Sequence, residues 1–280
     1  MSARLRGIAR ETVGVVAAGS YRGLGGGEVF LADAVAAARK GTVMVGPGAV
    51  DRAPVGAVPG TVFSDAVSSD TVFEVTGESS LEAARRLADR PVAVLNFSSA
   101  RNPGGGFLNG AQAQEEALCR ASALYACLLE APEFYAYHRA HRDPFYSDRV
   151  IYSPGVPVFR DDRGRFLDEP YSAGFLTSAA PNAGVIRRTL PERVGEVPGA
   201  VAARAERVLE TAVAYGYRRV VLGAWGCGVF QNDPGVVAEA FGGLLKDGGR
   251  FSGVFERVVF GVLDRTSGAV VRGAFSRVFD

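Results

Sequence analysis

From residue 71 onward, short apolar runs alternate with amphipathic stretches. The short runs have the length and the content of β-branched residues typical of buried strands. They cover residues 71–75, 92–97, 150–153, 156–159, 174–179, 219–222 and 256–263. The stretches between them predict helices over residues 81–90, 112–129, 198–215, from 234 to about 246, and 268–277. Strands that alternate with helices are typical of an α/β fold, in which helices cover a central sheet.

The first 65 residues have a weaker pattern. It predicts helices over residues 3–18 and 34–39 and strands over 28–32 and 42–45, whereas the glycine-rich segments 19–27 and 46–60 predict loops. We therefore expect residues 1–65 to form an N-terminal extension packed on the main domain, and residues 66–280 to form that domain.

Composition excludes several classes of protein. The chain has 280 residues, nearly half of them apolar, and a net charge of +1, so nothing predicts indiscriminate binding to nucleic acid. The three cysteines, Cys119, Cys127 and Cys227, form no metal or redox motif, and an odd count fits a reducing compartment. No signal peptide or membrane-spanning run is visible, and we expect a cytoplasmic protein.

A glycine loop after the strand at 92–97 carries the most distinctive chemistry. Gly104, Gly105 and Gly106 are consecutive, and Gln114-Glu115-Glu116 follows at the start of a predicted helix. Glycines allow positive φ angles and leave no Cβ between the main chain and a ligand. Adjacent helical residues diverge by about 100° around the axis, so Glu115 and Glu116 must have different roles. A solvated helix start is the ordinary alternative for such a pair.

A second glycine loop follows the strand at 219–222. It reads Gly226-Cys227-Gly228-Val229-Phe230, and its amides could bind a phosphate. Taken alone, a glycine turn with a core phenylalanine is the simpler reading. Trp225 is expected in the core, and Asn232 is expected either to cap the next helix or to contact ligand.

The two loops together resemble the poly(ADP-ribose) glycohydrolases. Three glycines, a short spacer and Gln-Glu-Glu are the signature of that family, and Asn102-Pro103 with the residues at 111–114 is similar to its compact bacterial-type branch. The second loop appears downstream in the expected order. The resemblance covers about residues 71–264, and the N-terminal part more loosely. It implies a macrodomain-like mixed sheet flanked by helices on both faces, with an N-terminal helical extension.

The resemblance also implies an activity and a set of roles. The expected reaction is hydrolysis of the ribose–ribose O-glycosidic bonds of poly(ADP-ribose), or of this polymer on an ADP-ribosylated protein, with release of ADP-ribose. Glu116 would be the general acid/base, and Glu115, the second catalytic residue, would bind ribose hydroxyls and help position the distal sugar. Gln114 would contact the substrate, and Asn102 would bond to a hydroxyl of the distal ribose. The main chain at Gly104, Gly105 and Gly106 would line the ribose and the nearby phosphate. The Phe230 ring of the second loop would pack on a ribose. The main chain of that loop would wrap the diphosphate through residues Gly226, Cys227, Gly228, Val229 and Phe230.

No cofactor, metal, DNA or membrane partner is implied, and a monomer is expected. His138 and His141 could share one helix face, but further metal ligands are not evident in the sequence. Two alternatives stay open. A non-catalytic ADP-ribose reader would not need a buried acid, and a Rossmann-type nucleotide-binding protein would need a Gly-x-Gly-x-x-Gly fingerprint that is missing here.

Overall fold

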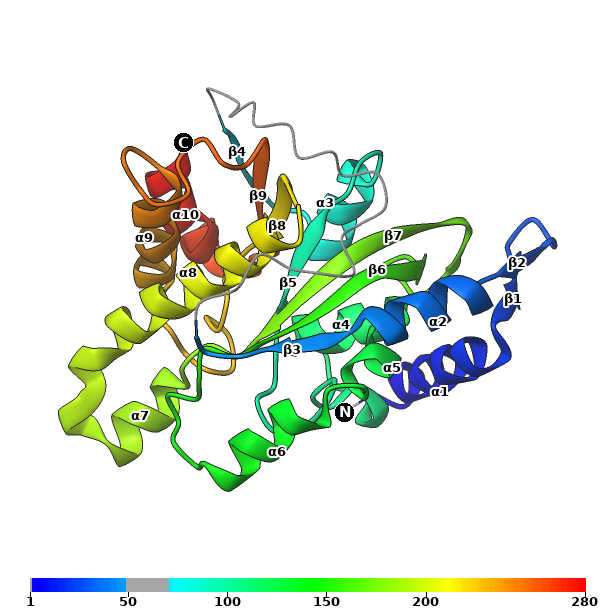
Figure 1. The fold of residues 1–280 in the computed structure, drawn as a ribbon, viewed down its shortest axis with the longest axis horizontal. Coiled ribbons are helices and arrows are strands. Elements are labelled where there is room, and N and C mark those ends of the chain that lie inside the picture. Colours follow the sequence, from blue (N-terminus) through cyan, green and yellow to red (C-terminus); the bar gives the residue numbers. More distant parts are fainter. Residues whose placement is uncertain (1, 49–70) are drawn as a thin grey trace.

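A computed structural model describes residues 2–48 and 71–280 (Figure 1). Most of the loop predicted over 46–60, and the proposed boundary between residues 65 and 66, lie outside the described residues. The division of the chain at that point therefore stays a prediction.

A mixed seven-stranded sheet forms the centre of the described chain. Its strand order is β3-β6-β7-β5-β8-β9-β4. Neighbouring strands are parallel from β7 to β4, whereas β6 runs antiparallel to both of its neighbours. The strands are β3 (Val43–Val45), β4 (Val72–Thr76), β5 (Ala93–Phe97), β6 (Val150–Arg160), β7 (Phe166–Ser178), β8 (Arg219–Leu222) and β9 (Arg257–Gly261).

The N-terminal segment follows its predicted pattern. Helix α1 (Ala3–Ala18) ends at Gly19, whose φ of 74° is the left-handed conformation that favours glycine at a helix end. The hairpin of β1 (Ser20–Arg22) and β2 (Glu28–Phe30) follows, so part of the predicted 19–27 loop is a strand. Helix α2 (Ala32–Gly41) then leads into β3, which forms one edge of the main sheet.

Helices cover both faces of the sheet, as expected. On one face, alternate strand residues such as Val94, Ile151 and Val221 pack in a core with α1, α2, α3 (Ser80–Leu87), α4 (Gln114–Ala121), α5 (Leu124–Leu128) and α6 (Pro132–Ala140). On the other face, residues such as Leu95 and Leu222 pack with α7 (Ala183–Thr189), α8 (Val197–Ala214), α9 (Pro234–Leu245) and α10 (Val270–Phe279). Figure 1 shows α1 and α2 on one side of the molecule and α8, α9 and α10 on the other.

The single helix predicted over 112–129 was wrong, because the chain breaks at Ser122. This residue is extended, with φ −143° and ψ 177°, and it forms a β-bridge with Val158. Its hydroxyl donates to the Leu118 carbonyl at 2.7 Å and accepts from the Leu124 amide at 3.2 Å. Serine side chains compete in this way with helical backbone bonds, so α4 and α5 are separate helices.

The strands predicted at 150–153 and 156–159 are one strand, β6. The pairing of β6 with β7 shifts between Ser153 and Val156, where Gly155 has φ of 51°. Such a bulge places an extra residue in a strand without ending it. Strand β7 also begins earlier than the expected residue 174, and the helices α6 and α7 were not predicted.

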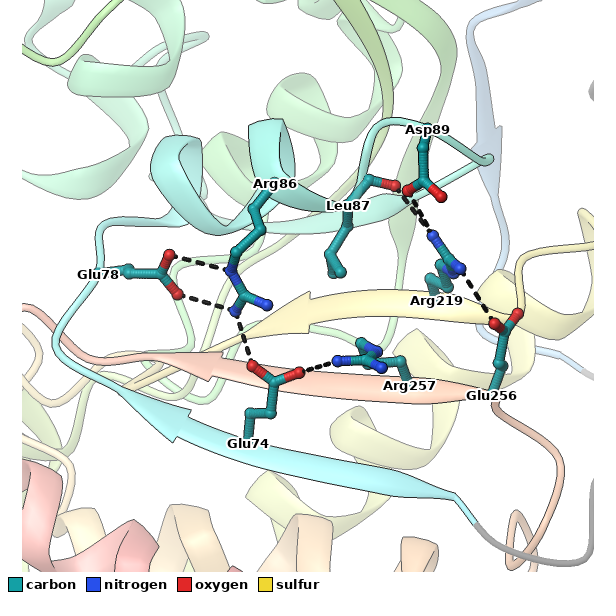
Figure 2. A network of polar contacts seen from close by, with 8 residues as sticks. All are labelled: Glu74, Glu78, Arg86, Leu87, Asp89, Arg219, Glu256 and Arg257. Atoms are coloured by element: carbon teal, nitrogen blue, oxygen red, sulfur yellow. Dashed lines mark hydrogen bonds and ion pairs between the residues drawn. The ribbon is translucent and has the colours of Figure 1, made fainter.

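A network of charged side chains ties α3 to the edge of the sheet at β4, β9 and β8 (Figure 2). Arg86 of α3 donates to Glu74 on β4 at 2.8 Å and to both oxygens of Glu78 at 3.1 and 2.9 Å. Arg257 on β9 donates to the other oxygen of Glu74. Opposite charges thus bridge the sheet edge and the helix that covers it.

The same figure shows a second cluster around Arg219 of β8. Its guanidinium donates to Asp89 at 2.6 Å, to Glu256 at 3.0 Å and to the Leu87 carbonyl at 3.3 Å, just beyond the end of α3. The C-terminal end of α3 is therefore fixed to β4 and β8 by ion pairs.

We expect Arg86→Met to lower the free energy of unfolding by about 1 kcal/mol, because an exposed ion pair is worth little alone and more within a network. The loss should shrink as salt concentration rises. Arg85→Met, at the adjacent exposed position, is the control. Urea unfolding at low and high salt measures both variants, and equal losses in the two would contradict a role for the network.

Candidate active site

The ends of three neighbouring parallel strands form one edge of the sheet. Strand β5 pairs in parallel with β7 on one side and β8 on the other, so the loops that follow these strands leave from the same edge. The triple-glycine loop follows β5, and the Gly226 loop follows β8. Ligands in α/β folds bind beyond this carboxyl edge, so the sheet brings the two predicted loops to one site.

Gly105 is the point on which both glutamates converge. It adopts φ of 58°, and an added Cβ would lie 2.6 Å from Glu116 Oε1 and 3.0 Å from Glu115 Oε2. Gly104 also has a positive φ, 66°, and a Cβ there would lie 2.9 Å from the Tyr125 ring. Only glycine allows the loop to run this close to the carboxyl groups.

Both carboxyl groups are buried, but their surroundings differ. Glu116 is 7% exposed; its Oε1 accepts from the Gly106 amide at 2.8 Å, and its buried Oε2 has no hydrogen-bond partner within residues 2–48 and 71–280. Glu115 is 2% exposed; its Oε2 accepts from the Ser99 amide at 2.7 Å, and its Oε1 lies 3.4 Å from Asn96 Nδ2. Glu116 thus keeps a free oxygen, whereas donors face both oxygens of Glu115.

Burial raises the pKa of Glu115 to about 8. The hydrogen bond from the Ser99 amide opposes this shift, and the nearby negative charge of Glu116 adds to it. At neutral pH the carboxyl pair therefore holds a proton.

The second loop presents main-chain amides at the same edge. Among the described residues, the amides of Gly226, Gly228, Val229 and Phe230 donate to no protein acceptor. Val229 is 79% exposed, whereas the Phe230 carbonyl accepts from the Gly184 amide at 3.0 Å. Free amides in succession on a held loop form the type of concavity that binds anions.

Comparison with known proteins identifies the family to which this chain belongs. Residues 9–161, more than half of the chain, match the model of the microbial-type PARG catalytic domain. The structure of poly(ADP-ribose) glycohydrolase (PARG) from Thermomonospora curvata is 49% identical and covers 99% of this chain and 100% of its own, with a TM-score of 0.89. The chain belongs to the microbial-type poly(ADP-ribose) glycohydrolase family.

Two further solved structures contain ligands. PARG from Thermomonospora curvata bound to the inhibitor ADP-HPD is 49% identical and covers 99% of each chain, with a TM-score of 0.88. PARG from Deinococcus radiodurans in complex with ADP-ribose is 42% identical and covers 88% of this chain and 97% of its own, with a TM-score of 0.78. No curated protein matches the chain.

These likenesses confirm the macrodomain-like fold and identify the protein as a glycohydrolase. They decide against the Rossmann-type alternative and against a non-catalytic reader. No helix in the described part of the chain is long and apolar enough to cross a membrane.

Gln114 and Asn102 of the glycohydrolase were both expected to contact the substrate, but their side chains differ in whether they bond to the protein. The Gln114 amide faces the protein: it accepts from the Phe97 amide at 2.9 Å and donates to Leu95 O at 2.8 Å and Ser80 Oγ at 3.0 Å. These bonds hold the start of α4 on β5. Asn102 is exposed, and its main chain closes the loop, because its carbonyl accepts from the Gly105 amide at 2.9 Å.

The main-chain amides of the triple-glycine loop are also partly occupied. The Gly105 amide donates to Asn102 O and the Gly106 amide to Glu116, so among the described contacts only Gly104 of the three glycines keeps a free amide. The loop therefore offers a ligand close approach to its main chain more than it offers hydrogen-bond donors.

The residues behind the second loop are structural. Trp225 is fully buried, as expected, and its indole donates to the Ser178 carbonyl at 3.1 Å. The expectation that Asn232 caps α9 was wrong: Asp233 is the cap, accepting from the amides of Gly235 and Val236. Asn232 Nδ2 instead donates to Pro181 O at 2.8 Å and Gly226 O at 3.3 Å, which fixes the turn at Gly226.

The histidines lie outside the carboxyl site. His138 is buried and its ring bonds to Phe134 O and Ser147 Oγ, both at 2.8 Å, while His141 bonds to Tyr137 O. Within the ranges that the structure describes, no group of three His, Cys, Asp or Glu residues could hold a metal ion. Cys119 and Cys127 are buried helix residues, as expected.

Sequence reasoning missed the groups that support the carboxyl pair. Asn96 and Ser99 were read only as part of a strand and its loop, yet both contact Glu115. Ser99 contacts Glu115 through its main-chain amide, which no side-chain pattern reveals. The polar side chain of Asn96 inside an apolar run was one available signal. Arg120, one helical turn after Glu116, was the other.

We expect the stability of the wild type to fall, relative to Glu115→Gln, as pH rises from about 4.5 to about 8. In this window the unfolded chain loses the Glu115 proton while the folded chain keeps it, so ionisation favours unfolding. A glutamine does not titrate, can still accept from the Ser99 amide, and can donate to Asn96 Oδ1, which is buried and has no partner in the part of the chain that the structure describes.

Urea unfolding across this pH range measures the difference between the two proteins. Glu133→Gln, at an exposed position on α6, controls for the change of residue type. A difference in the free energy of unfolding that does not vary with pH would show that folding does not raise the pKa of Glu115.

Proposed function

We propose that Glu116 is the general acid/base that hydrolyses the ribose–ribose bonds of poly(ADP-ribose) and releases ADP-ribose. The observation that supports this role is the free Oε2 of Glu116. It is buried, it is left without a partner in the described chain, and the bond from Gly106 to Oε1 fixes the direction of the carboxyl group.

The reaction needs a proton at the start and a base at the end. Glu116 would protonate the oxygen of the departing ribose as the bond to the anomeric carbon breaks, and the sugar left behind would become oxocarbenium-like. Glu116 would then take a proton from the water that attacks this carbon.

Glu115 and Asn102 would hold the ribose whose bond is cleaved. Asn102 is exposed next to the loop, with its side-chain amide available. Glu115 lies beside Glu116 but is constrained by Ser99 and Asn96, which suits a binding role better than proton transfer. Gln114, whose amide is committed to β5 and α3, would act by placing α4 and would contact substrate only if those bonds open.

The Gly226–Phe230 loop would bind the diphosphate of the same ADP-ribose unit. Its free amides support this role, because main-chain donors bind phosphate without a cation or cofactor. Phe230 would pack on a ribose; its ring is half-buried and lies 5.8 Å from the Tyr146 ring. The ADP-ribose bound by the Deinococcus radiodurans relative supports a ligand of this class.

Glu116→Gln should lower kcat on poly(ADP-ribose) by about 10²–10⁴-fold, the usual contribution of a general acid or base. Binding of ADP-ribose should change little, because the glutamine oxygen can still accept from the Gly106 amide. Release of ADP-ribose from purified polymer measures the first quantity, and calorimetric titration with ADP-ribose measures the second. Undiminished turnover would remove Glu116 from the proposed role.

Phe230→Ala should weaken ADP-ribose binding roughly 3- to 10-fold, as expected for the loss of one packed ring. The rate of the chemical step at saturating polymer should change less. The loop should keep its place, because the bond from Gly184 reaches the Phe230 main chain. Phe30→Ala, at a 76% exposed position on β2, is the control. If Phe230→Ala binds as tightly as wild type, the ring does not contact the ligand.

A further inference from the structure

Arg120 closes a ring of contacts around the carboxyl group of Glu116. Its Nη1 donates to the Ala111 carbonyl at 2.5 Å, and the Ala111 amide donates to the Gly106 carbonyl at 3.2 Å. The Gly106 amide donates in turn to Glu116 Oε1 at 2.8 Å. One turn of α4 joins Glu116 back to Arg120, because residues i and i+4 share a helix face.

The direction of the Arg120 side chain follows from helix geometry. Long side chains on a helix point back toward its N-terminus, so the guanidinium of Arg120 reaches the segment that precedes α4. There it holds Ala111, whose own Cβ would lie 2.7 Å from a Cβ at Gly106. The end of the triple-glycine loop is thereby packed tightly against the chain that enters the helix.

The C-terminal end of α4 is held from the other side. The Thr12 hydroxyl of α1 donates to the Arg120 carbonyl at 2.7 Å, which satisfies one of the carbonyls that a helix end leaves free. Arg120 therefore joins the N-terminal helix, the catalytic helix and the glycine loop.

Partial burial of the charged Arg120 guanidinium is energetically unfavourable, and this argues against an incidental surface contact. The guanidinium is only partly accessible to solvent, and burial lowers its pKa, while the nearby Glu116 carboxylate opposes that shift. Among the described side chains, it forms no ion pair within 4.0 Å. Its hydrogen bond in the structure goes to the Ala111 main chain.

We propose that Arg120 is a positioning residue of the glycohydrolase: it locks residues 106–111 onto the first turn of α4 and thereby fixes the Glu116 carboxyl against the Gly106 amide. The proposal rests on the acid/base role of Glu116 given above. Without the guanidinium, the loop end would lose its anchor, and the Gly106 amide would orient Glu116 less well. A displacement of about 1 Å at a reacting group can cost about 10²-fold in rate.

The test compares kcat, KM and ADP-ribose affinity in Arg120→Met, Arg120→Lys and wild type. Methionine fills similar space without a donor, whereas lysine keeps the charge and one donor that can reach Ala111 O. We expect kcat to fall about 10- to 100-fold in Arg120→Met and less in Arg120→Lys. KM and the Kd for ADP-ribose should stay within about threefold of wild type, because the diphosphate loop is untouched.

Arg207→Met is the matched control. Arg207 is also a largely buried helical arginine that donates to a loop carbonyl, that of Pro47 at 2.9 Å, but it lies on α8. Its loss should leave kcat unchanged. Hydrogen exchange adds a second readout, since the Gly106 amide should exchange faster in the Arg120 variants than in wild type or Arg207→Met.

The outcomes separate this proposal from the role of Glu116. Wild-type kcat in Arg120→Met, or a loss that appears in Kd and not in kcat, would overturn the positioning role. If Arg120→Met does not fold, Arg120→Gln decides, because its amide is too short to replace the guanidinium at Ala111 O: reduced kcat with unchanged Kd supports the proposal, and wild-type kcat refutes it. Full activity in Glu116→Gln would instead refute the acid/base assignment, whatever the Arg120 variants do.

Discussion

The close approach of a bare main chain to two buried carboxyl groups is the constraint on which this site depends. Burial of carboxylates is unfavourable unless protons or donors compensate for it. Here the compensation is local: the Ser99 amide serves Glu115, the Gly106 amide serves Glu116, and the raised pKa of Glu115 keeps a proton in the pair. A side chain at Gly105 would collide with both carboxyl groups and separate the loop from them.

The sheet makes this arrangement possible. Because β5 lies between β7 and β8 and runs parallel to both, the triple-glycine loop that leads to α4 and the Gly226 loop with its free amides leave from one edge. The carboxyl pair and the free amides are thereby separated in sequence by more than a hundred residues but leave from the same edge of the sheet.

The sequence alone predicted the parts of the fold that rest on local pattern. The strand at 219–222 and the helix at 3–18 have the predicted bounds, because local residues set them: a short apolar run for the strand and Gly19 for the end of the helix. The helix predicted over 112–129 failed, since its break depends on a bridge from Ser122 to Val158 that no local pattern reveals. The bulge in β6 was not predicted for the same reason. Proline and glycine end most strands, but here the pairing with β7 continues on both sides of the bulge.

The site shows the same limit at the level of single side chains. The motif identified Glu115 and Glu116, but it could not say that Gln114 turns inward to β5 while Glu116 keeps a free oxygen. Those differences arise from three successive residues pointing in three directions around one helix. The first faces the strand and the second meets Asn96 and Ser99, whereas the third reaches the Gly106 amide. The different contacts of Gln114, Glu115 and Glu116 therefore depend on how α4 is placed against the sheet. Gln114 bonds the first turn of α4 to β5, and Arg120 bonds its last turn to the chain segment that enters the helix.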